Sequence, residues 1–123
     1  MRDLSSYRKD YLKDTLNDLN TPSNPFILFN AWFKELEKSL DTNEINTMVL
    51  NTVGNDSFPK GRVVLLKYFS EEGFVFFTNY RSEKGLSIIN NNKVSITFFW
   101  KDYERQVIIK GKAEKTDEKL NKK

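Results

Sequence analysis

The fold of this chain is decided by residues 47–78, which read TMVLNTVGNDSFPKGRVVLLKYFSEEGFVFFT. Two apolar runs rich in β-branched residues, Thr47 to Val53 and Gly61 to Phe69, flank a turn segment that contains Gly, Asn, Asp and Pro. A second short turn, Glu71-Glu72-Gly73, leads into a third apolar run from Phe74 to Thr78. This succession predicts antiparallel strands joined by hairpins.

The sequence after this stretch continues the β pattern. Two more strands are expected, from Lys93 to Trp100 and from Arg105 to Thr116, joined by a turn at residues 101–104. A short helix capped by Ser82 is expected between Ser82 and Asn92. About five antiparallel strands, each with one face to bury, predict a small barrel or a curled sheet.

Two helices are expected before the strands. Apolar residues recur at three- and four-residue spacing from Leu4 to Leu19. Asn24 can cap a second helix, with Pro25 at the first helical position, where its missing N–H costs nothing. The apolar stripe of that helix consists of Phe29, Trp32, Phe33, Leu36 and Leu40. Such a stripe predicts a helix that packs on the sheet, and the expected fold class is mainly β with flanking helices.

Composition narrows the possible functions. A chain of 123 residues suits one domain, and 38% hydrophobic residues suffice for a core. The chain has no Cys and no His, which excludes disulfides and thiol nucleophiles and argues against zinc hydrolysis and Ser-His-Asp catalysis. No apolar run reaches the roughly 18–20 residues of a membrane span, and the N-terminus lacks a secretory signal, so a cytoplasmic location is expected. The balance of 20 basic and 17 acidic residues indicates a mixed surface.

Three polar segments could carry chemistry. Arg62 and Lys67 stand at the two ends of an apolar strand, on opposite faces if the strand is regular, and are either solvated ends or ligand contacts. Residues 76–85, FFTNYRSEKG, lead from a strand into a helix N-terminus, where N–H groups, a hydroxyl and cations can receive a phosphate. Gln106 could pair with a planar heterocycle through its amide or simply face water.

Taken together and in this order, the segments resemble the pyridoxamine 5′-phosphate oxidase family. The matching stretches are Arg62 to Lys67, Phe77 to Gly85, Phe98-Phe99-Trp100 and Arg105-Gln106-Val107, with further similarity at Arg8 to Tyr11 and at Asn24-Pro25. The resemblance implies an FMN-binding split β-barrel. Because the family's sequence continues well past Lys123, it also implies a barrel truncated at its C-terminal end. The implied domains are an N-terminal helical segment at 1–23, a possible substrate lid, and an incomplete FMN-binding domain at 24–123.

The resemblance also implies roles for individual residues. Arg62 and Lys84 would hold the FMN phosphate, and Gln106 would contact flavin at a site shared between two subunits, which implies a homodimer. Lys67 would be the catalytic residue, meeting both the flavin and the substrate phosphate. The full set of implied cofactor contacts is Arg62, Val63, Val64, Leu65, Lys67, Phe77, Thr78, Lys84 and Gln106. The implied substrate contacts are Arg8, Tyr11 and Lys67, although Arg8 and Tyr11 could equally be part of an exposed helix. No metal, nucleic acid or membrane is implied.

The implied reaction is oxidation of pyridoxamine or pyridoxine 5′-phosphate to pyridoxal 5′-phosphate, with reduction of dioxygen to hydrogen peroxide, in vitamin B6 salvage. Glu83 stands where many members carry a second arginine, a departure expected to weaken phosphate binding. Because further family contacts lie past Lys123, we expect the chain as given to bind FMN weakly and to oxidise substrate poorly or not at all.

Two alternatives stay open. The first is a non-catalytic FMN-binding module on the same barrel, which would bind flavin without producing peroxide. The second is a nucleic-acid-binding β-barrel, suggested by cations and aromatic residues that interleave between Tyr68 and Arg105. The mixed charge opposes the second alternative, because it offers no continuous basic groove.

Overall fold

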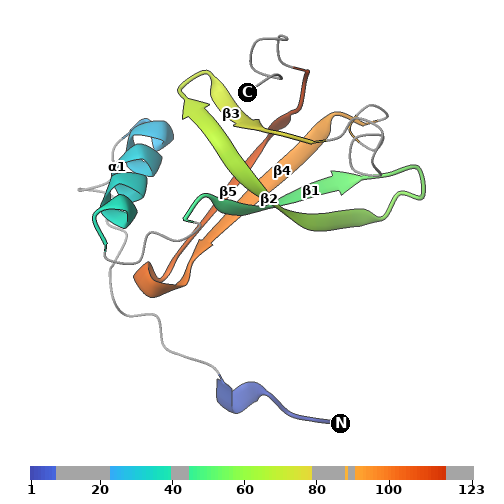
Figure 1. Ribbon diagram of the computed structural model, residues 1–123. Coiled ribbons are helices and arrows are strands. Elements are labelled where there is room, and N and C mark those ends of the chain that lie inside the picture. The colour runs from blue at the N-terminus through green and yellow to red at the C-terminus, as the bar shows by residue number, and fades with distance from the viewer. Residues whose placement is uncertain (8–22, 40–44, 79–87, 89–90, 116–123) are drawn as a thin grey trace.

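A computed structural model of the chain describes residues 1–7, 23–39, 45–78, 88 and 91–115. The elements in these ranges are η1 (Ser5–Tyr7), α1 (Pro25–Glu37), β1 (Thr47–Val53), β2 (Pro59–Ser70), β3 (Gly73–Phe76), β4 (Lys93–Trp100), η2 (Lys101–Tyr103) and β5 (Arg105–Lys112). The five strands form one sheet in the order β3-β2-β1-β4-β5, and every neighbouring pair is antiparallel (Figure 1). The predicted fold class, mainly β with a curled antiparallel sheet, is therefore confirmed.

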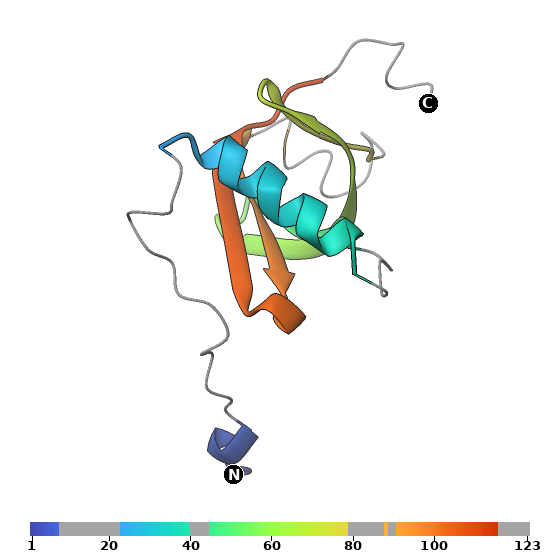
Figure 2. The same cartoon turned by 90° about the vertical axis from the view of Figure 1, so that its left-hand side faces the viewer.

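The sheet curls into a half-barrel, and α1 covers one side of it. In Figure 2 the helix lies across the curled strands, between β5 on one side and β2 with β3 on the other. Strands β1, β2 and β3 follow one another as hairpins, whereas β4 returns to pair with β1 in the middle of the sheet. The curl gives the sheet an inner face toward α1 and an outer face on the opposite side.

The strand register assigns each side chain to one of these faces. On β1, Met48, Leu50 and Thr52 alternate inward and are almost completely buried, whereas Val49 is exposed on the outer face. The outer face extends across β2, β4 and β5. Val49 pairs with Val63 on β2 and with Thr97 on β4, and Thr97 pairs with Ile108 on β5. Apolar side chains are exposed on this outer face, and they are Val49, Val63, Leu65, Phe99 and Ile108.

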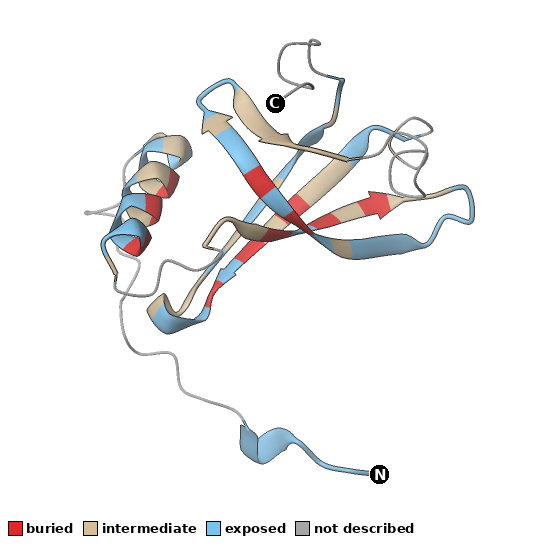
Figure 3. Cartoon of the chain, viewed as in Figure 1, coloured by how far each residue is buried: buried red, intermediate tan, exposed pale blue. Residues whose placement is uncertain are grey.

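Aromatic rings join α1 to the inner face. Phe29 is 4% exposed, and its ring centroid lies 5.2–5.7 Å from those of Phe69, Phe74, Phe98 and Trp100. Figure 3 shows the buried positions of α1 on the side of the helix that faces the strands. The predicted stripe is thus a core stripe, with Phe29, Phe33 and Leu36 buried and Trp32 packed at its margin. Leu40 lies outside the described residues.

The predicted start of α1 is also confirmed. Asn24 has an extended backbone, its side-chain oxygen accepts a hydrogen bond from the N–H of Phe26 at 3.0 Å, and Pro25 is the first helical residue. The amide thus satisfies a helix N–H that has no partner within the helix, while proline contributes no N–H at all. Local sequence alone determines this boundary.

Several predicted boundaries shift. Strand β2 extends over Pro59–Ser70, and β3 ends at Phe76, so Phe77 and Thr78 follow the strand instead of belonging to it. Strand β5 ends at Lys112, short of the predicted Thr116. The turn after β4 is a 3-10 helix closed by Glu104, whose φ of 53° is left-handed and whose N–H donates to the carbonyl of Lys101.

Both other expected helices fall mostly outside the described residues. Of the segment from Leu4 to Leu19, the structure describes only the part up to Tyr7, where η1 lies. Of the segment from Ser82 to Asn92, it describes Ile88, which is helical, and Asn91 and Asn92, which are not. The helices in the described ranges are all too short or too polar to cross a membrane.

Candidate functional site

Arg62 lies on the inner, core-facing side of β2. It pairs with Leu50 in the β1–β2 ladder and alternates with buried Val64 and Leu66. Its Nη1 donates a hydrogen bond to Thr52 Oγ1 at 3.3 Å. Within the described ranges, Thr52 supplies the one hydrogen bond of the Arg62 side chain, and no carboxylate forms an ion pair with it. A half-buried guanidinium with most of its five N–H groups unbonded to any described residue is suited to an anionic ligand.

Lys67 lies on the other face of the same strand and is exposed, as the odd spacing from Arg62 predicts. The pairing between β2 and β3 shifts register between Leu66 and Tyr68, so Lys67 sits at a β-bulge. A bulge redirects the side chain at that position and locally increases strand twist. The sequence did not indicate this bulge, because an apolar strand with a lysine looks the same with or without it.

Phe77 and Thr78 continue from β3 along β2. Because Leu66 pairs with Phe76 and the two strands are antiparallel, the chain after β3 runs back alongside β2 in the direction of Arg62. The hydroxyl oxygen of Thr78 is buried, and no hydrogen-bond partner for it is found among the described residues. A buried hydroxyl without a hydrogen-bond partner lowers the stability of the fold by roughly 1–3 kcal/mol, so a ligand that bonds this oxygen would be stabilised there.

Gln106 is not brought to this group within one chain. It lies on edge strand β5, exposed on the outer face and paired with Phe99. Strands β1 and β4 separate β5 from β2, and three strand spacings amount to roughly 14 Å. The structure thus places Arg62 and residues 63–67 on β2, and Phe77 and Thr78 directly after the neighbouring strand β3, with Gln106 apart from them.

The other predicted site residues cannot be placed. Arg8, Tyr11 and Lys84, together with Glu83, lie outside the described residues. Their roles remain predictions from the family resemblance.

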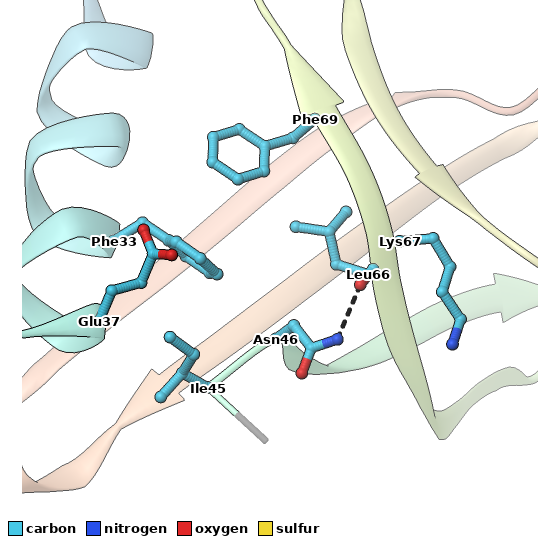
Figure 4. A pocket seen from close by; sticks show the side chains of 7 residues that line it. All are labelled: Phe33, Glu37, Ile45, Asn46, Leu66, Lys67 and Phe69. Carbon is cyan, nitrogen blue, oxygen red and sulfur yellow. Dashed lines mark hydrogen bonds between the residues drawn. The ribbon is translucent and has the colours of Figure 1, made fainter. Parts of the chain in front are cut away.

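A pocket of about 440 Å³ opens beside Lys67, between α1 and β2. Its lining residues are Phe33, Glu37, Ile45, Asn46, Leu66, Lys67 and Phe69. Figure 4 shows the side chain of Lys67 on the far side of β2 from Phe33 and Glu37. The volume falls in the range of small-molecule sites, roughly 300–1,000 Å³. Neither Arg62 nor Thr78 lines this pocket, so it is distinct from the place where those two residues lie.

Asn46 secures β2 next to Lys67. Its side-chain Nδ2 donates to the carbonyl of Leu66 at 2.8 Å (Figure 4). Its own backbone carbonyl accepts from the N–H of Leu66 at 2.9 Å. These two bonds hold the backbone at the bulge, where the sheet ladder is interrupted. Sequence reasoning did not identify Asn46, which resembles an ordinary polar residue before a strand.

Arg105 anchors the start of β5 to α1. Its guanidinium carbon lies 4.5 Å from the ring centroid of Trp32 and 5.6 Å from that of Tyr103, and its Nη1 bonds Glu35 Oε2 at 2.9 Å. The Arg105 side chain is 13% exposed. Since Arg105 faces inward, the next residue, Gln106, must face outward. The contacts of Arg105 with α1 therefore also fix the position of Gln106 on the outer face.

Thr52 is a further residue that sequence reasoning missed. It is 1% exposed, and it occupies the inward position that follows Met48 and Leu50 along β1. The sequence did contain one signal: Thr52 follows Met48 and Leu50 at a spacing of two residues, which puts its hydroxyl on the apolar face of the strand. In the stretch TMVLNTV that signal was hidden, because threonine is common in strands for its β-branched shape.

Comparisons with known proteins bear on this site. A sequence model described as pyridoxamine 5′-phosphate oxidase matches residues 34–123. A pyridoxine/pyridoxamine 5′-phosphate oxidase of Flavobacterium johnsoniae is 57% identical over 118 residues, which cover 96% of this chain and 55% of that protein. The enzyme of the same name from Flavobacterium psychrophilum is 51% identical over 121 residues, covering 98% of this chain and 56% of that protein. The chain thus spans about half the length of these curated relatives.

Solved structures share the fold. The protein PhzG from Burkholderia lata 383, solved with tetrahydrophenazine-1-carboxylic acid, superposes with a TM-score of 0.78 at 24% identity, covering 87% of this chain and 54% of that one. A pyridoxamine 5′-phosphate oxidase-related, FMN-binding protein from Nostoc punctiforme superposes with a TM-score of 0.62 at 22% identity, covering 72% of this chain and 47% of that one. With the sequence match over residues 34–123, the chain belongs to the pyridoxamine 5′-phosphate oxidase family.

Proposed function

We propose that the chain binds FMN, with the flavin phosphate held by Arg62 and Lys84 and the ring system lying along the strand Val63 to Leu65 and the segment Phe77–Thr78. The observation that carries this proposal is the half-buried guanidinium of Arg62, bonded to Thr52 and without a carboxylate partner among the described residues. A dianionic phosphate would satisfy its remaining N–H groups with charge-assisted hydrogen bonds.

The described residues suit such a ligand in a second respect. The buried hydroxyl of Thr78 lacks a partner within the described ranges and follows β3 toward Arg62, so it can exchange a hydrogen bond with a ligand there. The family membership of the chain and the FMN-binding relative from Nostoc punctiforme support flavin as that ligand.

The proposed reaction is oxidation of pyridoxamine or pyridoxine 5′-phosphate to pyridoxal 5′-phosphate, and the Flavobacterium relatives are named pyridoxine/pyridoxamine 5′-phosphate oxidases. With the amine substrate, the reaction also consumes water and releases ammonia. Bound FMN would supply a two-electron acceptor that dioxygen can reoxidise, with hydrogen peroxide as the product. Lys67, exposed at the bulge of β2, is proposed to hold the substrate phosphate, and its positive charge would stabilise the negative charge of reduced flavin. The proposed location is the cytoplasm.

A homodimer is proposed because Gln106 lies roughly three strand spacings from β2, too far to join the same flavin in one chain. The exposed apolar side chains of the outer face, among them Val63 and Ile108, would be covered by a second copy. In such a dimer Gln106 of one copy can reach the flavin of the other.

Flavin binding is tested by titrating the purified chain with FMN and with riboflavin, which lacks the phosphate, and following the flavin spectrum. Arg62→Ala is expected to lower FMN affinity by about tenfold to a hundredfold, the worth of a charge-assisted hydrogen bond, with little effect on riboflavin. Lys93→Ala, which removes an exposed cation at the start of β4, is the matched control and should leave both affinities unchanged. Equal affinity of the wild-type chain for FMN and riboflavin would rule out the phosphate site.

The oxidase activity is tested separately by measuring hydrogen peroxide formed from pyridoxamine 5′-phosphate. Peroxide production that Lys67→Ala abolishes supports the proposed reaction. Flavin binding without any peroxide would instead identify the chain as a non-catalytic FMN-binding module.

A further inference from the structure

Among the described residues, Thr52 is the one polar residue that is buried. It takes an inward position on β1 after Met48 and Leu50, where a valine would have nearly the same shape and no polar atom to desolvate. A buried hydroxyl is tolerated when it is hydrogen-bonded, and the partner here is the guanidinium of Arg62. The hydroxyl therefore serves Arg62 and not the packing of the core.

The strand register explains how the two side chains meet. Arg62 pairs with Leu50 in the β1–β2 ladder, and Thr52 pairs with Lys60, so Thr52 and Arg62 are diagonal neighbours on the inner face. Thr52 Oγ1 accepts from Nη1 of Arg62 at 3.3 Å. This bond uses one N–H of a planar guanidinium that carries five, and it fixes the group while leaving the other donors for a ligand.

We infer that Thr52 is a positioning residue for phosphate recognition: its hydroxyl holds the guanidinium of Arg62 in place for the flavin phosphate. The inference rests on the proposed function. Without the hydroxyl, the arginine side chain samples several rotamers, and binding must then restrict them at an entropic cost. Thr52 itself does not touch the phosphate in this scheme, so its effect is confined to ligands that carry one.

The experiment compares the affinities of the purified chain for FMN and riboflavin and takes their ratio as the measure of phosphate recognition. Thr52→Val is expected to reduce this ratio by about three- to tenfold, the range expected for one net hydrogen bond, with riboflavin affinity unchanged. Thr52→Ser keeps the hydroxyl and should restore the wild-type ratio. Thr52→Ala is a second loss variant in case valine perturbs folding, and circular dichroism verifies the fold of each.

Thr47→Val is the matched control. Thr47 lies on the same strand, and its hydroxyl is also buried but has no hydrogen-bond partner among the described residues. Removing that hydroxyl should leave the ratio of FMN to riboflavin affinity unchanged. A second control is Thr52→Val in an Arg62→Ala background, where the hydroxyl has no guanidinium to hold and the substitution should not change the ratio further.

The possible outcomes separate the inference from the function on which it rests. If Arg62→Ala abolishes the preference for FMN but Thr52→Val leaves it intact, the positioning role is wrong and the phosphate site stands. If Thr52→Val weakens FMN and riboflavin equally, Thr52 acts only on the fold, and the inference also fails. If the wild-type chain shows no preference for FMN, the inference and the proposed phosphate site are both wrong.

Discussion

The contact between Arg105 and α1 gives a stability prediction in which two kinds of interaction can be separated. Arg105→Lys keeps a positive charge within reach of Glu35 but loses the planar group that lies over Trp32 at 4.5 Å and near Tyr103 at 5.6 Å. Glu35→Gln does the reverse, because it removes the ion pair and leaves the guanidinium on the rings.

The cation–π contact and the ion pair are expected to contribute different amounts to the free energy of unfolding. A cation over an aromatic ring contributes about 0.5–2 kcal/mol, more when desolvated, and the Arg105 side chain is only 13% exposed. The side chain of Glu35 is 49% exposed, so solvent screening limits the ion pair to about 0.2–1 kcal/mol. We therefore expect Arg105→Lys to lower the free energy of unfolding by about 1–2 kcal/mol and Glu35→Gln to lower it by less.

Urea unfolding at low salt and at about 1 M sodium chloride provides the assay. At the higher concentration the Debye length is about 3 Å, so the effect of Glu35→Gln should shrink while most of the effect of Arg105→Lys remains. Glu37→Gln, an exposed carboxylate on the same helix, is the matched control and should change stability by less than about 0.5 kcal/mol. The reasoning is refuted if Arg105→Lys costs no more than Glu35→Gln, or if its cost vanishes in salt.

Three further predictions concern the sheet and the helix. Val63→Asp places a charge on the exposed apolar outer face and should weaken self-association in light scattering; an unchanged oligomer would show that this face is not the interface. Gly61→Ala brings a Cβ within 2.8 Å of Asn51 Oδ1, so Asn51 must give up its bond to Ser95 at a cost of about 1 kcal/mol. Most of that cost should disappear in an Asn51→Ala background, and its persistence in urea unfolding would point instead to the contact of the new Cβ with Val49 Cγ1, at 3.1 Å. Asn24→Ala removes the cap of α1 and should lower the free energy of unfolding by about 1 kcal/mol, whereas Asn24→Ser keeps a capping oxygen and should retain most of the stability.

Local sequence determined the elements of this protein. The alternation in Thr47–Val53 and Lys93–Trp100 predicted both strands with their observed bounds, because alternating apolar residues and β-branched side chains suit an extended chain with one buried face. The Asn24-Pro25 pair located the start of α1 for an equally local reason. Both signals act within a few residues, so no knowledge of the fold was needed to read them.

The arrangement of the candidate site depended on tertiary structure. The order of the strands places Gln106 away from Arg62, the shift in the β2–β3 ladder puts Lys67 at a bulge, and the β1–β2 register brings Thr52 to Arg62. Each of these depends on which strands pair and in what register, and pairing is settled by burial of side chains from the whole sheet and from α1. The sequence by itself determined where the five strands lie, to within a few residues at the ends of β2, β3 and β5, whereas only the assembled sheet decided which side chains face inward together and meet.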